Sequence, residues 1–188
     1  MIHDFDEKLA FSQGVRGLSD IMLLKQAIPG CVDVRKTSYS EDVKGVDYIA
    51  VLDGGAEIGI DAKAREKGAS KFWKYGEAEL ALELWSVFPT DKYKGKTGWT
   101  LSKSTNVDLI LYTFAPTDWR KYYLLPYQML RMAFIRKRED WEVRYSKKMQ
   151  DSGNWYSQAL FVPASVVLQA IAEVMQTEIM TVVGSDRS

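Results

Sequence analysis

The most constraining feature of this sequence is a pair of short segments joined by adjacent glycines. Residues 46–52 are rich in β-branched and aromatic side chains, and residues 57–64 alternate between apolar and polar. Strict alternation is typical of a strand with one buried face. Gly54 and Gly55 permit the positive φ angles of a tight turn. The sequence therefore predicts a β-hairpin whose strands are these two segments.

The loop of this hairpin decides which side chains share a face. A three-residue loop, Gly54-Gly55-Ala56, places Asp47 opposite Lys63, with Asp61 beside them because residues two apart on a strand project alike. A loop one residue shorter pairs Asp47 with Ala62 and sends the two acids to opposite faces. Asp47, Asp61 and Lys63 therefore form a cluster only if odd residues pair with odd.

Composition narrows the chemistry that such a cluster can carry. The 188 residues include one histidine, His3, and one cysteine, Cys31, with 25 basic and 25 acidic residues. A histidine-based triad, a Cys/His zinc site and an HExxH metalloprotease need more of these residues, and no intramolecular disulfide can form. Carboxylates, lysine, hydroxyls and a hard metal ion remain. The zero net charge favours no particular partner.

Paired carboxylates beside a lysine are suited to metal-assisted phosphate chemistry. Two carboxylates about 4 Å apart repel by roughly 4 kcal/mol at an effective dielectric near 20, and a divalent cation turns this repulsion into attraction. Their oxygens suit Mg²⁺ or Mn²⁺. Asp47 and Asp61 are therefore candidate metal ligands, and Lys63 is a candidate to orient water or stabilise the phosphorus centre. The alternative is an ordinary hairpin in which Asp61 and Lys63 form a solvated surface pair.

The same residues resemble the motif of the PD-(D/E)xK nuclease superfamily. Asp47 leads the first strand and Asp61-Ala62-Lys63 lies on the second, with Val46 in place of the proline and aspartate in place of the commoner glutamate. Residues 98–104, followed by a strand led by Asp108, are similar to small phage and mobile-element members, including Holliday-junction-resolvase-like ones. The resemblance implies a restriction-endonuclease-like fold and a nuclease that hydrolyses DNA phosphodiester bonds with Mg²⁺ or Mn²⁺. It also implies DNA as a partner, and nuclease folds of this kind often form homodimers, although the sequence does not decide the oligomeric state.

Further residues are candidates for supporting roles. Glu83 is a candidate catalytic helper from a neighbouring strand, and the resemblance to resolvases makes Glu7 a candidate acid on a first helix. Residues 119–150 contain nine basic and three acidic side chains, which suggests contact with a DNA backbone. The candidate nucleic-acid-binding residues are Lys103, Ser104, Arg131, Arg136, Lys137 and Arg138.

The remaining pattern predicts an α/β (α+β) fold in which helices flank a central mixed sheet that carries the hairpin. We expect a single domain, 1–188, with a core at 1–126 and an extension of helices and strands at 127–188. Strands are predicted at 31–36, 77–88, 107–114 and 122–125, and helices before residue 28, at 127–138 and from Pro163. Apolar stretches are short or broken by charges, so we expect a cytoplasmic protein without a membrane partner. Two alternatives to the nuclease remain: an inactive nuclease-fold module of a phage or mobile element that binds nucleic acid or protein, and an unrelated module for a small ligand.

Overall fold

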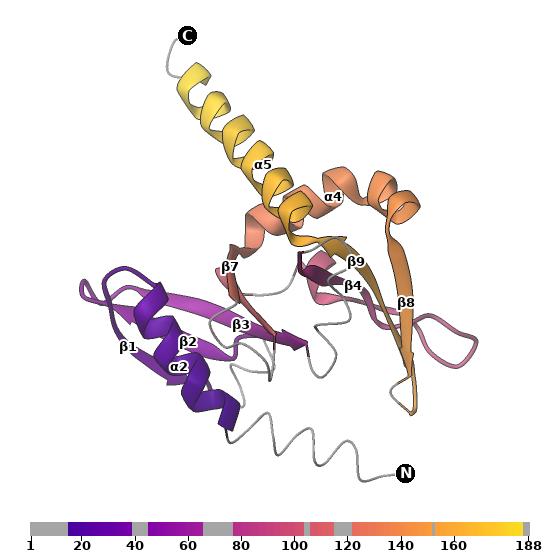
Figure 1. Cartoon of the computed structure of the whole chain (residues 1–188), viewed down its shortest axis with the longest axis horizontal. Helices are drawn as coiled ribbons and strands as arrows, with labels where there is room; N and C mark the ends of the chain where they lie inside the picture. The colour runs from indigo at the N-terminus through magenta and orange to yellow at the C-terminus, as the bar shows by residue number, and fades with distance from the viewer. Residues whose placement is uncertain are drawn as a thin grey trace. The chain divides into compact units, whose positions relative to one another are not determined.

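The computed structural model describes residues 15–38, 45–65, 77–103, 106–114, 122–151 and 153–185 (Figure 1). The chain divides into two compact units. Unit 1 comprises residues 1–67 and 104–125, and unit 2 comprises residues 68–103 and 126–188. The chain therefore enters unit 2 for the second time at residue 126, one residue before the position at which we expected the C-terminal extension to begin. Residues 68–103, which we expected in the core, group with that extension.

Unit 1 is a mixed five-stranded sheet with one described helix. The strand order is β1-β2-β3-β6-β7, with β1, β2 and β3 antiparallel and β6 parallel to β3. The predicted mixed sheet is therefore present. The elements are α2 (Val15–Ala27), β1 (Cys31–Lys36), β2 (Tyr48–Leu52), β3 (Glu57–Arg65), β6 (Leu109–Phe114) and β7 (Tyr122–Pro126).

Helix α2 packs on one face of this sheet. Even-numbered residues of β2 and β3 supply the strand side of the contact, because alternate side chains on a strand point to the same face. The odd-numbered side chains, Asp61 and Lys63 among them, project from the opposite face. The buried cluster under α2 consists of Leu23, Leu24, Ile28, Val34, Tyr48, Ala50, Ile60 and Leu111.

The turn between β2 and β3 is centred one residue before the predicted position. The Leu52 N–H donates to the Ala56 carbonyl at 2.9 Å, and the Gly55 N–H donates to the Leu52 carbonyl at 2.8 Å. The three-residue loop is therefore 53–55 instead of 54–56. Gly55 has a φ of 79°, the left-handed conformation that closes a three-residue hairpin loop.

Moving the centre of the loop by one residue moves the register by two. Tyr48 lies opposite Ile60. Extending this antiparallel register by one residue places Asp61, and not Lys63, opposite Asp47. The prediction of Asp47 opposite Lys63 was therefore wrong. Odd residues still pair with odd, because every three-residue loop has this parity. The predicted shared face survives the error in register.

Unit 2 is an antiparallel four-stranded sheet with two long helices. The strand order is β5-β4-β9-β8. The predicted strand at 77–88 and the predicted helix start at residue 127 are confirmed, although that helix runs on to Arg144. Pro163 ends a strand and the last helix begins one residue later. The elements are β4 (Glu79–Val87), β5 (Lys96–Thr97), η2 (Trp99–Leu101), α4 (Tyr127–Arg144), β8 (Ser146–Asp151), β9 (Tyr156–Pro163) and α5 (Ala164–Ser185). No helix in the described ranges has the length and apolar character needed to cross a bilayer.

Candidate functional site

Asp61 and Lys63 form an ion pair on the face of β3 opposite α2. Lys63 Nζ lies 2.6 Å from Asp61 Oδ1. Asp61 is only 6% exposed, in contrast to the solvated surface pair that the alternative interpretation required. A carboxylate removed from water needs compensation for its lost hydration, and the ammonium group supplies part of it.

Asp47 is fixed by its backbone and by its side chain at the start of β2. Ala62 donates its backbone N–H to Asp47 Oδ2 at 2.7 Å. Ala62 lies beyond the last residue pair of the β2–β3 ladder, so the carboxylate satisfies a backbone donor that the ladder leaves unpaired. The Asp47 N–H donates to the Ile60 carbonyl at 2.8 Å. Thr37 holds the backbone just before β2, since its Oγ1 donates to the carbonyls of Val46, at 2.6 Å, and Asp47, at 3.0 Å.

The two carboxyl groups and the lysine influence one another. Burial raises the pKa of the Asp61 carboxyl from 3.8 to about 6, while the Lys63 ammonium acts in the opposite direction. Asp47 adds to the rise through charge repulsion and through a hydrogen bond to Asp61. The structure therefore brings together all three residues of the predicted cluster. A strongly shifted carboxyl with a defined charge partner is a recognised mark of a functional site.

Two carboxylates form the donor set available to a metal ion here. In the described part of the chain, no group of three or more His, Cys, Asp or Glu side chains is placed to hold a metal. Mg²⁺ commonly uses one or two carboxylates and completes its octahedron with water and substrate phosphate. A cation beside Asp47 and Asp61 would favour the ionised form that burial opposes. The donor chemistry of the site therefore fits Mg²⁺ or Mn²⁺.

Gly59 allows β6 to approach β3 next to the site. A Cβ atom at this position would lie 2.6 Å from the Asn106 carbonyl oxygen. The Gly59 N–H donates to Asp108 Oδ2 at 2.8 Å, and the Asp108 N–H returns a bond to the Gly59 carbonyl at 2.8 Å. Asp108 therefore holds the start of β6, which carries Ile110 opposite Asp61.

Sequence reasoning missed two positioning residues, Thr37 and Gly59. The glycine had a usable signal, because an isolated glycine inside an alternating strand indicates close backbone approach. Thr37 had none, since it lies in a polar segment and reaches Val46 and Asp47 only through the tertiary fold.

Glu83 has a structural partner in unit 2. Its Oε2 accepts the Trp99 backbone N–H at 3.1 Å, at the start of η2. The connection passes so close to β4 that a Cβ at Gly98 would overlap the Glu83 carbonyl. Lys103 is exposed just after η2, in the same unit. Glu7 and Ser104, which the sequence also singled out, lie outside the described residues.

The basic residues of α4 differ in their engagement. Three of the four predicted DNA contacts on this helix are in ion pairs with acids of α4 or α5, which leaves less charge available for phosphate. Arg131 is different, because its Nε is buried without a hydrogen-bond partner in the described part of the chain. The pairs are Arg136 with Glu178 at 3.2 Å, Lys137 with Glu173 at 2.8 Å, and Arg138 with Glu142 at 2.5 Å.

Comparison with models of known protein families, with characterised proteins and with solved structures finds no significant match. The chain's own residues therefore carry any indication of function, above all the cluster of Asp47, Asp61 and Lys63.

Proposed function

We propose that this chain is a metal-dependent nuclease that hydrolyses DNA phosphodiester bonds at Asp47, Asp61 and Lys63. The observation that carries the proposal is the Asp61 carboxylate, which is buried against a lysine ammonium and a second carboxylate. Burying such a group costs stability, and groups of this kind are concentrated at functional sites. Binding a divalent cation is a purpose that uses both acids.

Each residue of the cluster has a distinct role in this proposal. Asp47 and Asp61 hold the cation through carboxylate oxygens, and the Ala62 N–H fixes the orientation of Asp47. A bound Mg²⁺ or Mn²⁺ supplies an acidified water and neutralises charge on the phosphate. Lys63 orients the attacking water or stabilises the charge that develops on phosphorus, and its ion pair with Asp61 sets its position.

The surrounding fold is compatible with this role. The β2–β3 hairpin, the parallel β6 and the helix on the opposite face together give a mixed sheet that carries the acids on one side. We propose that this sheet is a restriction-endonuclease-like core. The proposal extends the resemblance seen in residues 47–63 to the rest of unit 1.

Cleavage assays on plasmid, linear and branched DNA test the proposal directly. Each substrate is incubated with Mg²⁺, with Mn²⁺ and with EDTA, using the wild type, Lys63→Ala and Asp61→Asn. The matched control is Lys25→Ala, because Lys25 pairs with Asp33 at 2.8 Å at a solvated position in the same unit. We expect metal-dependent cleavage that falls by about 10²-fold or more in both site variants and is unchanged in the control.

Cleavage that survives Lys63→Ala in a correctly folded protein would refute the assigned role. A wild type that binds DNA and cleaves none of these substrates with either metal would favour the alternative of an inactive nuclease-fold binding module. The observation that favours this alternative is the small number of metal donors, since no group of three or more His, Cys, Asp or Glu side chains is placed to hold a metal among the described residues.

A further inference from the structure

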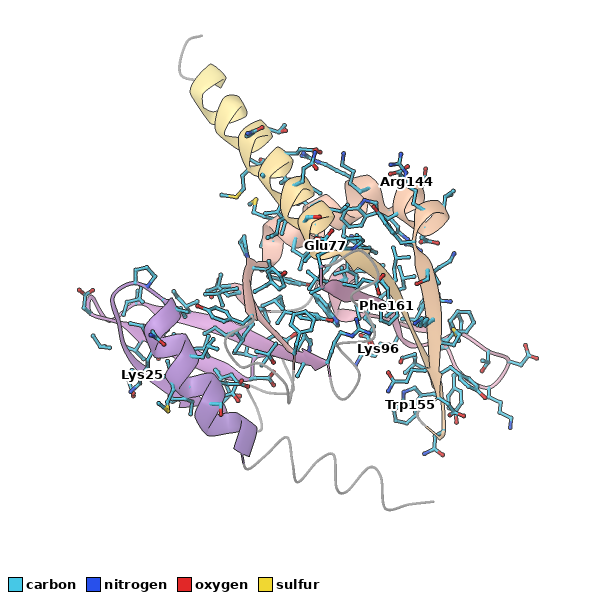
Figure 2. The ribbon with its side chains drawn as sticks, viewed as in Figure 1. Lys25, Glu77, Lys96, Arg144, Trp155 and Phe161 are labelled. Carbon is cyan, nitrogen blue, oxygen red and sulfur yellow. The ribbon has the colours of Figure 1, made fainter. Side chains whose placement is uncertain are left out.

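Unit 2 carries a group of exposed aromatic and lysine side chains that the proposed catalytic site does not use. Figure 2 labels two of them, Trp155 and Lys96. The aromatic and thioether members are between 39% and 47% exposed. We call this group the hairpin surface, defined by Tyr93, Met149, Trp155 and Tyr156 together with Lys92, Lys94 and Lys96.

Backbone pairing brings the two segments of the hairpin surface together. Within the β8–β9 hairpin, Met149 lies opposite Gln158 and Asp151 lies opposite Tyr156. The Phe88 N–H donates to the Tyr156 carbonyl at 2.6 Å, which joins the β4–β5 loop to the start of β9. That loop carries Tyr93, Lys92 and Lys94, and Lys96 begins β5 directly after it.

One of the exposed aromatics, Tyr156, continues a face of the sheet that is buried elsewhere. Leu160 and Val162 are fully buried, and Tyr156 lies on the same face of β9 because alternate residues share a face. Figure 1 shows the β8–β9 hairpin running away from α4 and α5 towards its tip. That face of the strand therefore emerges into solvent at Tyr156, and Trp155, the residue just before the strand, is exposed beside it. Exposed aromatics that extend a core face in this way indicate a binding surface.

The charge around these aromatics favours a polyanion. Residues 85–97 and 146–156 contain five lysines and two aspartates. Lys147 pairs with Glu142 at 3.1 Å, and Lys148 lies 5.0 Å from the centre of the Phe161 ring. By contrast, the side chains of Lys92, Lys94 and Lys96 are exposed and have no ion-pair partner in the described part of the chain.

We propose that the hairpin surface binds a single-stranded stretch of DNA, with bases stacked on Trp155 and Tyr156 and phosphates beside Lys92, Lys94 and Lys96. Flat rings flanked by cations suit unpaired bases, whose faces are open, whereas a duplex hides these faces within its stack. The inference rests on the proposed nuclease function and deepens it, because it assigns the substrate class as DNA with unpaired segments.

Binding measured without metal separates this surface from the catalytic site. The full chain is titrated, in EDTA, against a fluorescently labelled oligothymidylate and against a blunt duplex of equal length. The variants are Trp155→Ala combined with Tyr156→Ala, and Lys92→Ala combined with Lys94→Ala and Lys96→Ala. Tyr122→Ala is the matched control, since Tyr122 is an exposed aromatic of unit 1. Trp155→Phe retains a stacking ring and serves if the double alanine variant does not fold.

We expect the aromatic variant to lose roughly tenfold or more in affinity for the single strand and less than twofold for the duplex. The lysine variant should lower the slope of log affinity against log salt by about 2. Equal losses for both DNAs, unchanged single-strand affinity, or a wild type that prefers the duplex would overturn the inference. An oligouridylate that binds more tightly than the oligothymidylate would also overturn it, because the strand would then be RNA.

The two proposals can fail independently. If Asp61→Asn abolishes cleavage while the aromatic variant keeps full preference for single strands, the nuclease stands and the hairpin surface is refuted. If the aromatic variant loses single-strand binding while no variant or metal affects cleavage, the surface stands and the assigned catalytic site fails.

Discussion

The two hairpins of this chain, β2–β3 and β8–β9, present charged side chains in opposite environments. The first lies inside a five-stranded sheet with neighbours on both sides, and it buries Asp61 beside Lys63. The second ends its sheet, and every residue of β8 is exposed. Neighbouring strands on both sides of β3 can remove a carboxylate from water, whereas an edge strand leaves its lysines hydrated.

This difference separates chemistry from binding. Burial in the β2–β3 hairpin raises the pKa of Asp61 to about 6, so the protein environment changes what that group can do. In β8 the Lys147 pair with Glu142 is exposed, and solvent and salt screen it. In the proposed binding surface, side chains of the exposed hairpin would therefore act through their number and spacing along a long ligand.

Replacing Gly59 with alanine should have the largest effect. The new Cβ would lie 2.6 Å from the Asn106 carbonyl, so β3 and β6 must separate beside Asp61. We expect a loss of about 3 kcal/mol in unfolding free energy, measured by urea denaturation, together with loss of cleavage. In the exposed hairpin, Gly153→Ala places alanine at a φ of 83° and should cost about 1 kcal/mol.

Gly54→Ala is the control, because nothing lies within 4 Å of the added atom and φ is not positive there. It should change stability by less than about 0.5 kcal/mol. A loss at Gly59 no larger than the loss at Gly153 would contradict the view that the β2–β3 hairpin is the more tightly constrained of the two.

Asp61→Asn should stabilise the protein above pH 6 by about 2 kcal/mol. The pKa of Asp61 is about 6 when folded and 3.8 in its ordinary state, so folding favours the protonated group. The stability contributed by the proton is complete below pH 3.8 and is lost as the pH rises through 6. Asparagine stays neutral, so thermal denaturation should show a gain at pH 8 that disappears near pH 4.

Asp151→Asn provides the comparison in the exposed hairpin. Asp151 Oδ1 accepts the Gly153 N–H at an exposed turn, and the substitution should change stability little at either pH. If Asp61→Asn gave the same pH-independent change, burial of Asp61 would not be the source of its altered chemistry.

The contrast between the hairpins also explains what could be predicted from sequence. Residues 57–64 alternate cleanly because one face of β3 meets α2, so the strand and its polar face were predictable. The predicted loop was displaced by one residue, but the prediction that odd-numbered residues pair with odd-numbered ones was still correct, because any three-residue loop here gives that pairing. The meeting of Asp47, Asp61 and Lys63 was therefore foreseeable from local pattern.

The remaining features depend on long-range packing. Strand β8 has no buried face, so it carries no alternation from which it could be predicted. The assignment of β4 to a second sheet depends on its pairing with β9, whose residues come more than 70 positions later. Ion pairing of Arg136, Lys137 and Arg138 likewise depends on how α4 meets α5 and on helical spacing within α4. The sequence of the basic segment therefore could not show how many of its positive charges are already neutralised by ion pairs.

Thr37→Val should cost about 1 kcal/mol and weaken metal binding. The substitution removes the hydroxyl that donates to the carbonyls of Val46 and Asp47, and it leaves the size of the side chain unchanged. Because these hydrogen bonds fix the start of β2, the concentration of Mg²⁺ needed for half-maximal cleavage should rise while the salt dependence of DNA binding stays constant. Thr177→Val is the control, since its hydroxyl donates to the Glu173 carbonyl on an exposed helix, away from the carbonyls of Val46 and Asp47. An equal loss in both variants would remove any special role for Thr37.

Lys147→Ala should have the smallest effect on stability, below about 0.5 kcal/mol in urea denaturation. Lys147 pairs with Glu142 at an exposed position, and Arg138 continues to bind the same carboxylate after the substitution. The small difference should shrink further in high salt, because salt shortens the screening length and weakens the attraction between solvated charges. Lys63→Ala, in contrast, leaves a buried carboxylate without its cation and should destabilise the protein more at pH 8 than at pH 5. If the two lysine variants had equal effects at both pH values, the β2–β3 hairpin would be as solvated as β8, and the physical basis for a catalytic site there would be lost.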